Sequence, residues 1–166
     1  WSSDVCSSDL ARFETAVATA RREGKLLAGG TRKKGQLFDH GHYIEPTIVG
    51  DLPTEHALLR DELFLPFVAL ARCKDLADGL RRGNAVPYGL TAGVYSTDKA
   101  ELDYFFAHAE AGVLYANRRS GATTGAWPGI QTFCGWKGSG ATSKGGLGPF
   151  YLPQFMREQS RTVMGA

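Results

Sequence analysis

Side chains suited to binding a small molecule occur in two stretches of the chain. In the first stretch, Glu62 is followed two residues later by the aromatic Phe64. A carboxylate has two acceptor oxygens that can hold both hydroxyls of a ribose, and a solvated acid on a surface turn is the alternative. The second stretch, residues 112–140, is a short apolar run followed by a long glycine-rich loop. Loops of this length are functional or disordered, and the bulky apolar side chains here favour an ordered binding loop.

Within this loop, residues 121–126 (GATTGA) combine glycines with other small residues at the end of a predicted strand. Such a segment can present consecutive backbone N–H groups that hold a carboxylate or an oxyanion, although a plain flexible turn fits the residues equally well. Cys134 lies further along the same loop, where backbone N–H groups can lower the pKa of a thiol. A nucleophile also needs a base, and no histidine is near Cys134 in the sequence, which favours a packing role.

Three other patterns are weaker. His40 and His42 are spaced like a metal pair, but a third ligand is not placed, which favours polar loop residues. Residues 138–140 (GSG) and 145–148 (GGLG) resemble phosphate loops without the Gly-Lys-Ser/Thr ending. Arg118 and Arg119, together with Trp127 and Trp136, could bind single-stranded nucleic acid, but the net charge of +2 does not support this function.

The composition is that of one globular domain, because 43% of the residues are hydrophobic and 22% are charged. The small net charge argues against a nucleic-acid or anionic-membrane surface. Three cysteines without a C-x-x-C pair indicate neither a disulfide framework nor a zinc knuckle. No apolar run approaches the ~20 residues that span a bilayer, and no signal peptide is evident. We therefore expect a cytoplasmic location, no metal, no membrane partner and no nucleic acid.

Apolar spacing predicts the elements of the first half. Residues at spacings of three and four from Leu10 to Ala20 predict an amphipathic helix that Gly24 ends. Strands are expected at residues 25–28, 43–49 and 67–71, and Pro46 argues that the second of these is an edge strand or bulged. Between the last two strands, Thr54 is expected to cap a short helical turn that runs to Leu59.

The second half alternates helices with strands. Helices are expected at residues 75–84 and from Asp98, the latter burying Leu102, Phe105, Phe106 and Ala109. Strands are expected at residues 91–96 and 113–116, with a turn at residues 88–90 and a strand-like segment at residues 159–164. This alternation predicts an α/β fold with parallel strands.

The motifs, in their order along the chain, resemble the C-terminal part of the aldehyde dehydrogenase family. The resemblance covers residues 11–163, and the ordered set is specific although no single motif is. The matching residues are Gly29 and Gly30, 45–48 (EPTI), 61–64 (DELF) with Pro66, Asn84, 88–92 (YGLTA), Gly112, Asn117, Phe133, Gly135, Lys137, Ser139 and Gly140.

This resemblance implies part of a doubly wound α/β catalytic domain at residues 11–148 and a tail for oligomerisation at residues 149–166. Residues 1–10 (WSSDVCSSDL) read like a sequencing-adaptor remnant, so we expect them to be non-native and give Cys6 no role. The family's N-terminal Rossmann domain, catalytic cysteine and glutamate base would then lie upstream. No catalytic residue is expected in this chain, which should be inactive alone.

Site roles also follow from the resemblance. It implies that Glu62 binds the nicotinamide ribose of NAD or NADP and that Phe64 packs near it. It places Asn117 and Phe133 at positions where family members line or support the substrate tunnel. The loop is most similar to that of the subgroup oxidising glutamate semialdehyde (1-pyrroline-5-carboxylate), in which Gly125 and Ala126 would anchor the substrate's α-carboxylate through backbone N–H groups.

Three positions depart from the family pattern. Leu65 replaces a glycine, which would crowd the cofactor side, and Thr132 and Cys134 replace residues of the usual Pro-Phe-Gly-Gly. The expected partners are an aldehyde substrate and further copies of the intact protein. The alternatives are an enzyme for another aldehyde, the dehydrogenase half of a bifunctional proline-degrading protein, and a non-catalytic binding or assembly module.

Overall fold

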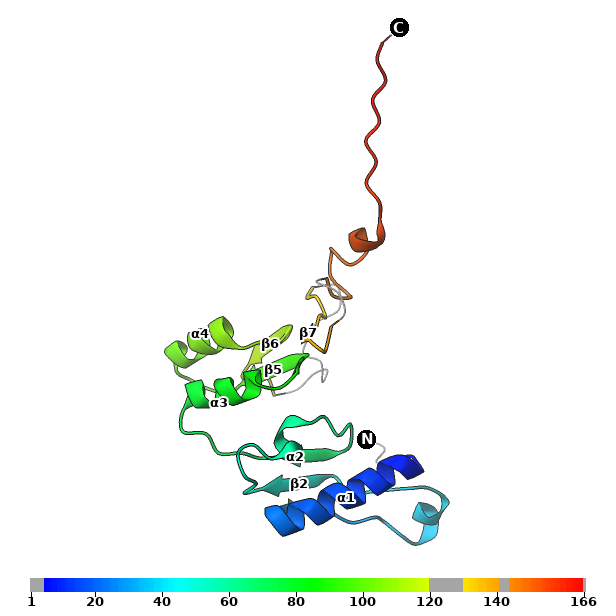
Figure 1. Cartoon of the computed structure of the whole chain (residues 1–166), viewed down its shortest axis with the longest axis vertical. Helices are drawn as coiled ribbons and strands as arrows, with labels where there is room; N and C mark the ends of the chain where they lie inside the picture. The colour runs from blue at the N-terminus through cyan, green and yellow to red at the C-terminus, as the bar shows by residue number, and fades with distance from the viewer. Residues whose placement is uncertain (1–4, 120–129, 141–143, 166) are drawn as a thin grey trace. The chain divides into compact units, whose positions relative to one another are not determined.

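The computed structural model describes residues 5–119, 130–140 and 144–165. They form two compact units, residues 1–73 and 74–166. Figure 1 labels the elements, which in chain order are α1 (Ser7–Glu23), β1 (Lys25–Ala28), the 3-10 helix η1 (Gln36–His40), β2 (Thr47–Gly50), α2 (Ala57–Arg60), β3 (Phe67–Ala69), α3 (Leu76–Asn84), β4 (Tyr88–Gly89), β5 (Thr91–Val94), α4 (Lys99–His108), β6 (Val113–Ala116), β7 (Trp136–Lys137) and the 3-10 helix η2 (Pro153–Phe155).

Helix α1 and a three-stranded sheet make up the first unit. The helix forms where the apolar spacing predicts, and the N–H of Gly24 donates to the carbonyl of Ala20 at 2.9 Å to end it. Its buried face supplies Leu10, Phe13 and Val17, which pack with Ile44 as the core of the unit. Residues 7–10 belong to this helix, although whether they are native stays a prediction.

The sheet has the order β1-β2-β3, with β1 antiparallel and β3 parallel to the central β2. The prediction that the Pro46 strand is an edge strand is therefore wrong. Pro46 precedes the first residue of β2, so its missing N–H removes nothing from the ladder. An irregularity in register does occur in this pair, but it lies in β1, between Leu26 and Ala28.

Two glycines after β1 allow a close backbone approach. A Cβ on Gly29, whose φ is 70°, would lie 2.2 Å from the carbonyl oxygen of Pro46. The N–H of Gly30 donates to Thr47 Oγ1 at 2.9 Å, and this hydroxyl donates to the carbonyl of Glu45 at 2.8 Å. Thr47 is 1% exposed, so the bonds satisfy a polar group inside the core. The family-like Gly-Gly and Glu-Pro-Thr motifs are thus two sides of one contact.

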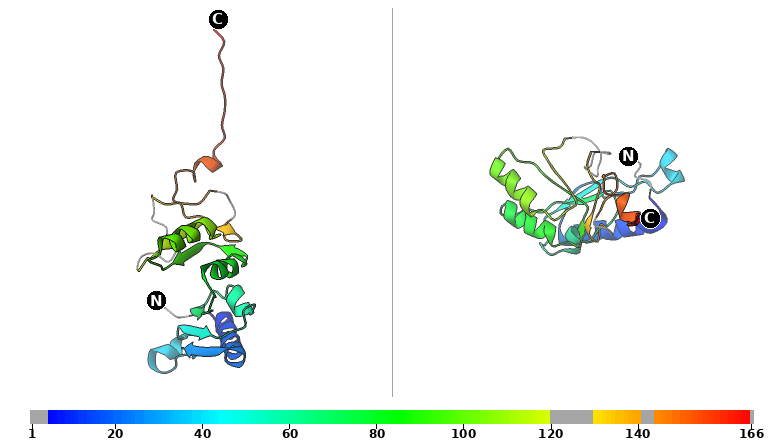
Figure 2. Two further views of the ribbon diagram at one scale, coloured as in Figure 1. Left: turned by 90° about the vertical axis from the view of Figure 1, so that its left-hand side faces the viewer. Right: turned by 90° about the horizontal axis from the view of Figure 1, so that it is seen from above.

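In the second unit, helices α3 and α4 lie next to each other (Figures 1 and 2) and two small sheets carry the strands. Strands β5 and β6 are parallel, and β4 and β7 are antiparallel. Asp75 and Asp98 cap the two helices by accepting N–H bonds from Asp78 and Ala100. Phe105 and Ala109 are buried as expected, but the expectation for Phe106 is wrong, since it is 48% exposed.

Other expectations are corrected locally. The N-cap of α2 is His56 rather than Thr54, and residues 88–89 are a strand rather than a turn. Residues 159–164, expected to be strand-like, form no strand and are exposed. The fold is α/β, as predicted, and contains the parallel pairs β2–β3 and β5–β6. A continuous doubly wound sheet stays a prediction, since the described strands form three small sheets.

Candidate functional site

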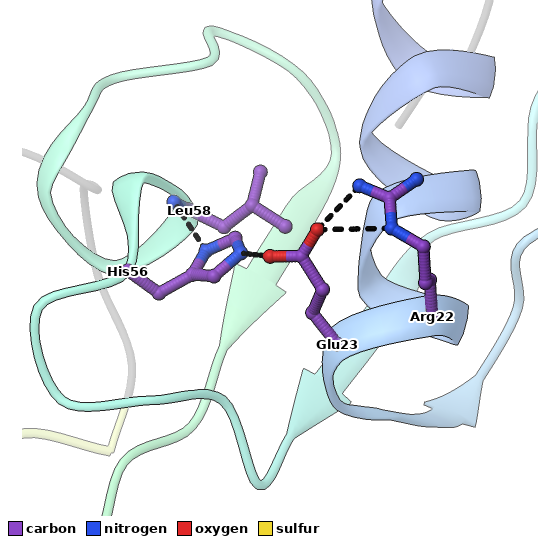
Figure 3. A network of polar contacts seen from close by, with 4 residues as sticks. All are labelled: Arg22, Glu23, His56 and Leu58. Carbon is purple, nitrogen blue, oxygen red and sulfur yellow. Dashed lines mark hydrogen bonds and ion pairs between the residues drawn. The ribbon is translucent and has the colours of Figure 1, made fainter.

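Helix α2 positions the segment that carries Glu62, and its start is fixed by a polar chain (Figure 3). His56 Nδ1 accepts the N–H of Leu58 at 3.0 Å, so the ring proton is on Nε2, which donates to Glu23 at 2.9 Å. Arg22 bonds the same carboxylate at 3.0 Å. The pKa of Glu23 is lowered by the hydrogen bond from Arg22 first and by that from His56 second. The end of α1 therefore anchors the start of α2.

Glu62 and Phe64 are both exposed on the segment that follows α2. Among the described residues, no hydrogen bond or ion pair engages the Glu62 carboxylate. Phe64 is 84% exposed and has a φ of 55°, a left-handed conformation that is unusual for a bulky residue. Strained backbone is found preferentially at ligand-binding sites. A free carboxylate beside an aromatic held out of the core is suited to the ribose of a nicotinamide cofactor.

Leu65 replaces the glycine of the family pattern, and whether it crowds the cofactor side stays a prediction. Leu65 is partly buried and packs against the cluster of Leu10, Phe13, Val17 and Ile44. Its carbonyl accepts the N–H of Phe67 at 2.7 Å. Leu65 thus anchors the segment to the core, while Phe64 turns the opposite way, toward solvent.

Asn117 serves the backbone of two strands. Its Oδ1 accepts the N–H of Ser96 at 3.0 Å, and its Nδ2 donates to the carbonyl of Ser96 at 2.8 Å. Its own N–H donates to the carbonyl of Val94 at 2.8 Å, and its φ is 54°. The amide therefore joins the carboxyl ends of β5 and β6 and is already engaged, so this structure favours the supporting role over direct contact with substrate.

Phe133 begins a segment, residues 133–140, that we call the docking segment. The N–H of Phe133 donates to the carbonyl of Gly146 at 2.8 Å. A Cβ on Gly112 would lie 1.7 Å from the carbonyl oxygen of Cys134, so only glycine allows this approach. The Sγ of Cys134 donates to the carbonyl of Gly112 at 3.4 Å, and no histidine bonds to this thiol in the described residues. Cys134 is thus a packing residue, as its sequence context favours.

Sequence reasoning assigned no role to the polar groups that hold the docking segment. Lys137 Nζ donates to the carbonyls of Asn84 and Val86 at 2.5 and 3.4 Å and lies 2.7 Å from a carboxylate oxygen of Glu110. Ser139 Oγ accepts the N–H of Gly89 at 3.0 Å. Residues 138–140, which resembled a phosphate loop, therefore belong to this contact.

The remaining candidates do not add a site. His42 Nδ1 lies 3.0 Å from the guanidinium of Arg32, so this ring nitrogen already has a hydrogen-bond partner. Residues 5–119, 130–140 and 144–165 contain no group of three His, Cys, Asp or Glu arranged to hold a metal ion. An open hollow of about 620 Å³ beside α4 is lined by residues 106–112, Leu114 and Trp136, and includes none of the predicted site residues. Helices in the described ranges are too short or too polar to cross a membrane.

The predicted site residues fall into two groups. Glu62 and Phe64 lie in the first unit, while Asn117 and Phe133 lie in the second. Asn117 and Phe133 bond to different partners and not to each other. Gly125 and Ala126, with the rest of residues 121–126, lie outside the described residues.

Comparison with known proteins agrees with these features. A model of the aldehyde dehydrogenase family matches residues 5–160. The chain belongs to the aldehyde dehydrogenase family. This aldehyde dehydrogenase chain is 36% identical over 160 residues to the 1-pyrroline-5-carboxylate dehydrogenase of Bacillus cytotoxicus, a match that covers 95% of the chain and 30% of the relative. The chain thus spans about a third of the length of such curated relatives.

Solved structures give the same family and fold. A 1-pyrroline-5-carboxylate dehydrogenase from Thermus with bound NAD superposes with a TM-score of 0.74 at 34% identity, over 86% of this chain and 26% of that one. Proline utilization A from Bdellovibrio bacteriovorus superposes with a TM-score of 0.78 at 36% identity, over 92% of this chain and 15% of that one. Aldehyde dehydrogenase 21 from Physcomitrella patens, in complex with the product succinate, superposes with a TM-score of 0.68 at 32% identity, over 83% of this chain and 27% of that one.

Proposed function

We propose that this chain is the C-terminal part of an NAD(P)-dependent aldehyde dehydrogenase that oxidises L-glutamate 5-semialdehyde to glutamate in proline catabolism. The observation that carries the proposal is the similarity, at 34–36% identity over most of the chain, to 1-pyrroline-5-carboxylate dehydrogenases from two genera. The α-carboxylate of this substrate matches the anion-binding character predicted for residues 121–126.

The exposure of Glu62 and Phe64 supports a role for these two residues in binding the cofactor. The Glu62 carboxylate is exposed and unpaired within the described residues, and the neighbouring Phe64 is held outward. These two side chains would hold the nicotinamide ribose, and the cofactor would accept the hydride. Residues 133–140 would form part of the tunnel wall. The catalytic cysteine and the general base are assigned to the part of the parent enzyme upstream of residue 11, and the 166-residue chain alone is expected not to reduce NAD.

The tail, residues 149–166, is proposed to contribute to a homo-oligomer of the intact enzyme. The described part of this tail after η2 forms no helix or strand and exposes Met156, Val163 and Met164. A second candidate function is oxidation of a different aldehyde, which is favoured by the likeness to the succinate-bound aldehyde dehydrogenase 21.

Two variants of the intact enzyme test the substrate and cofactor sides against each other. Gly125→Val keeps the backbone N–H but places a branched side chain where the carboxylate would sit, so kcat/KM for glutamate semialdehyde should fall roughly a hundredfold, and that for an aliphatic aldehyde far less. Glu62→Gln should raise the KM for NAD and leave the preference between aldehydes unchanged. Equal losses on both aldehydes for Gly125→Val would contradict the substrate assignment.

A further inference from the structure

We propose that Lys137 is a positioning residue for the substrate side of the site, and that its ammonium group clamps the docking segment onto the ends of α3 and α4. The inference rests on the proposed function in one respect, namely that Phe133 contacts the aldehyde. The clamp itself stands on contacts within the second unit.

The ammonium group of Lys137 has three acceptors. They are the carbonyl of Asn84, the carbonyl of Val86 and the carboxylate of Glu110, at 2.5, 3.4 and 2.7 Å. A lysine has three N–H donors, so all of them are used. Asn84 is the last residue of α3, where a cation also interacts favourably with the helix dipole. The side chain is 24% exposed, so water screens these contacts less than at an open surface.

Asn84 extends the clamp to the second helix. Its Nδ2 donates to the carbonyl of His108 at 2.8 Å, and its Oδ1 accepts the N–H of Glu110 at 3.0 Å. The carbonyl of the same residue receives Lys137. One residue therefore joins the end of α3, the end of α4 and the docking segment. Glu110, the ionic partner of Lys137, is held in the same network.

Backbone geometry shows that the docking segment is strained where Lys137 stands. Lys137 has a φ of 54°, a conformation that glycine adopts readily and other residues avoid. Such a conformation persists where its surroundings determine it. Three features hold the backbone at Lys137. They are the ladder between β4 and β7, a bond from the N–H of Gly138 to the carbonyl of Pro87 at 2.9 Å, and the three side-chain contacts of Lys137. The side chain and the turn thus fix the path of the three residues, 134–136, that connect Lys137 to Phe133.

The test uses three variants of the intact enzyme. Lys137→Met keeps much of the side-chain volume and removes every contact of the ammonium group. Lys137→Arg retains donors that can reach the carbonyls and Glu110. The matched control is Lys99→Met, which removes an exposed ion pair to Asp103 at 2.5 Å.

We expect Lys137→Met to raise the KM for the aldehyde roughly tenfold, because misplaced binding groups weaken substrate positioning, with kcat and the KM for NAD within about twofold. Lys137→Arg should stay within about threefold of wild type, and Lys99→Met should be unchanged. A fall in kcat with an unaltered aldehyde KM, as a reduced folded fraction would give, overturns the proposal. So does an equal defect in Lys137→Met and Lys99→Met.

Amide hydrogen exchange on the 166-residue chain tests the clamp without any activity. In Lys137→Met, exchange at Gly89 and Gly138 should accelerate roughly tenfold, because their acceptors lie across the clamped contact. Unchanged exchange overturns the clamp. If the wild-type enzyme oxidises some other aldehyde, the substrate assignment fails, while these exchange rates and the KM for that aldehyde still test Lys137.

Discussion

The amide of Asn117 holds the carboxyl ends of β5 and β6 with bonds to both backbone groups of Ser96. In α/β folds the residues after parallel strands form the ligand-binding edge of the sheet. Asn117 stands at that edge, and Gly125 and Ala126 follow it eight and nine positions later in the sequence. We therefore expect any effect of Asn117 on a substrate to be indirect, through the point at which the chain leaves β6.

Replacing Asn117 separates the two physical contributions of this residue. Asn117→Ala removes both side-chain bonds and keeps a Cβ at a φ of 54°, so it should destabilise the chain by about 2 kcal/mol. Asn117→Gly removes the same bonds but suits the left-handed backbone, and should cost about 1 kcal/mol less. Urea unfolding measures both, and an Ala variant as stable as the Gly variant would rule out backbone strain at this position.

At the residue scale, a sequence pattern can be read where neighbours along the chain carry it. Glu62 and Phe64 are such a pair, and the structure leaves both side chains exposed on one segment, while their cofactor role stays a prediction. The Lys137 contact was not predictable, because it joins residues 53 positions apart. A lysine followed by glycine and serine carries no local sign that its acceptors are carbonyls at the end of a helix.

At the scale of elements, α1, α3 and α4 form at the expected places because periodicity and terminal residues agree. The exception is α2, whose cap is a histidine. His56 can accept the N–H of Leu58 through Nδ1 because Glu23, 33 positions earlier, takes the proton-bearing Nε2. Strand pairing also could not be predicted from neighbouring residues in the sequence, since Pro46 suggests an edge strand and β2 is the central strand of its sheet.

Helix α3 offers a test by pH. The N–H of Lys74 and the guanidinium of Arg81 bond Asp78, and in that order they lower its pKa to about 2. Because the pKa is depressed on folding, the stabilisation is present above the unfolded value of 3.8 and is lost as the pH falls toward about 2. Asp78→Asn should therefore lower the urea midpoint at pH 7, and the difference from wild type should shrink between about pH 4 and pH 2.

Asp103→Asn, on α4, is the matched control for the Asp78→Asn variant on α3. Its ion pair with Lys99 is exposed, with side-chain exposures of 65% and 84%, so it contributes little to stability. We expect almost no shift in the urea midpoint at pH 7. A constant difference between Asp78→Asn and wild type across the whole pH range would show that the carboxylate's charge is not what stabilises α3.

At the scale of the molecule, the sheet of the first unit has one apolar face that the other described residues of this unit leave open. Thr47 and Val49 of β2 are buried, while Ile48 between them is 37% exposed, and its partner Val68 on β3 is 54% exposed. Parallel strands normally have both faces covered. The chain also spans about 30% of the length of its relative from Bacillus cytotoxicus. We infer that further polypeptide of the parent enzyme covers Ile48 and Val68.

The double variant Ile48→Thr, Val68→Thr distinguishes a covered face from an open one. In the 166-residue chain it should reduce self-association and binding of a hydrophobic dye, because it places hydroxyls on an exposed apolar patch. In the intact enzyme the same change should destabilise the fold by about 2 kcal/mol or more, because the hydroxyls would be buried without partners. Thermal unfolding and dye fluorescence of both proteins measure this reversal. An intact enzyme that tolerates the double variant as well as the isolated chain does would show that this face is open to solvent in the parent protein.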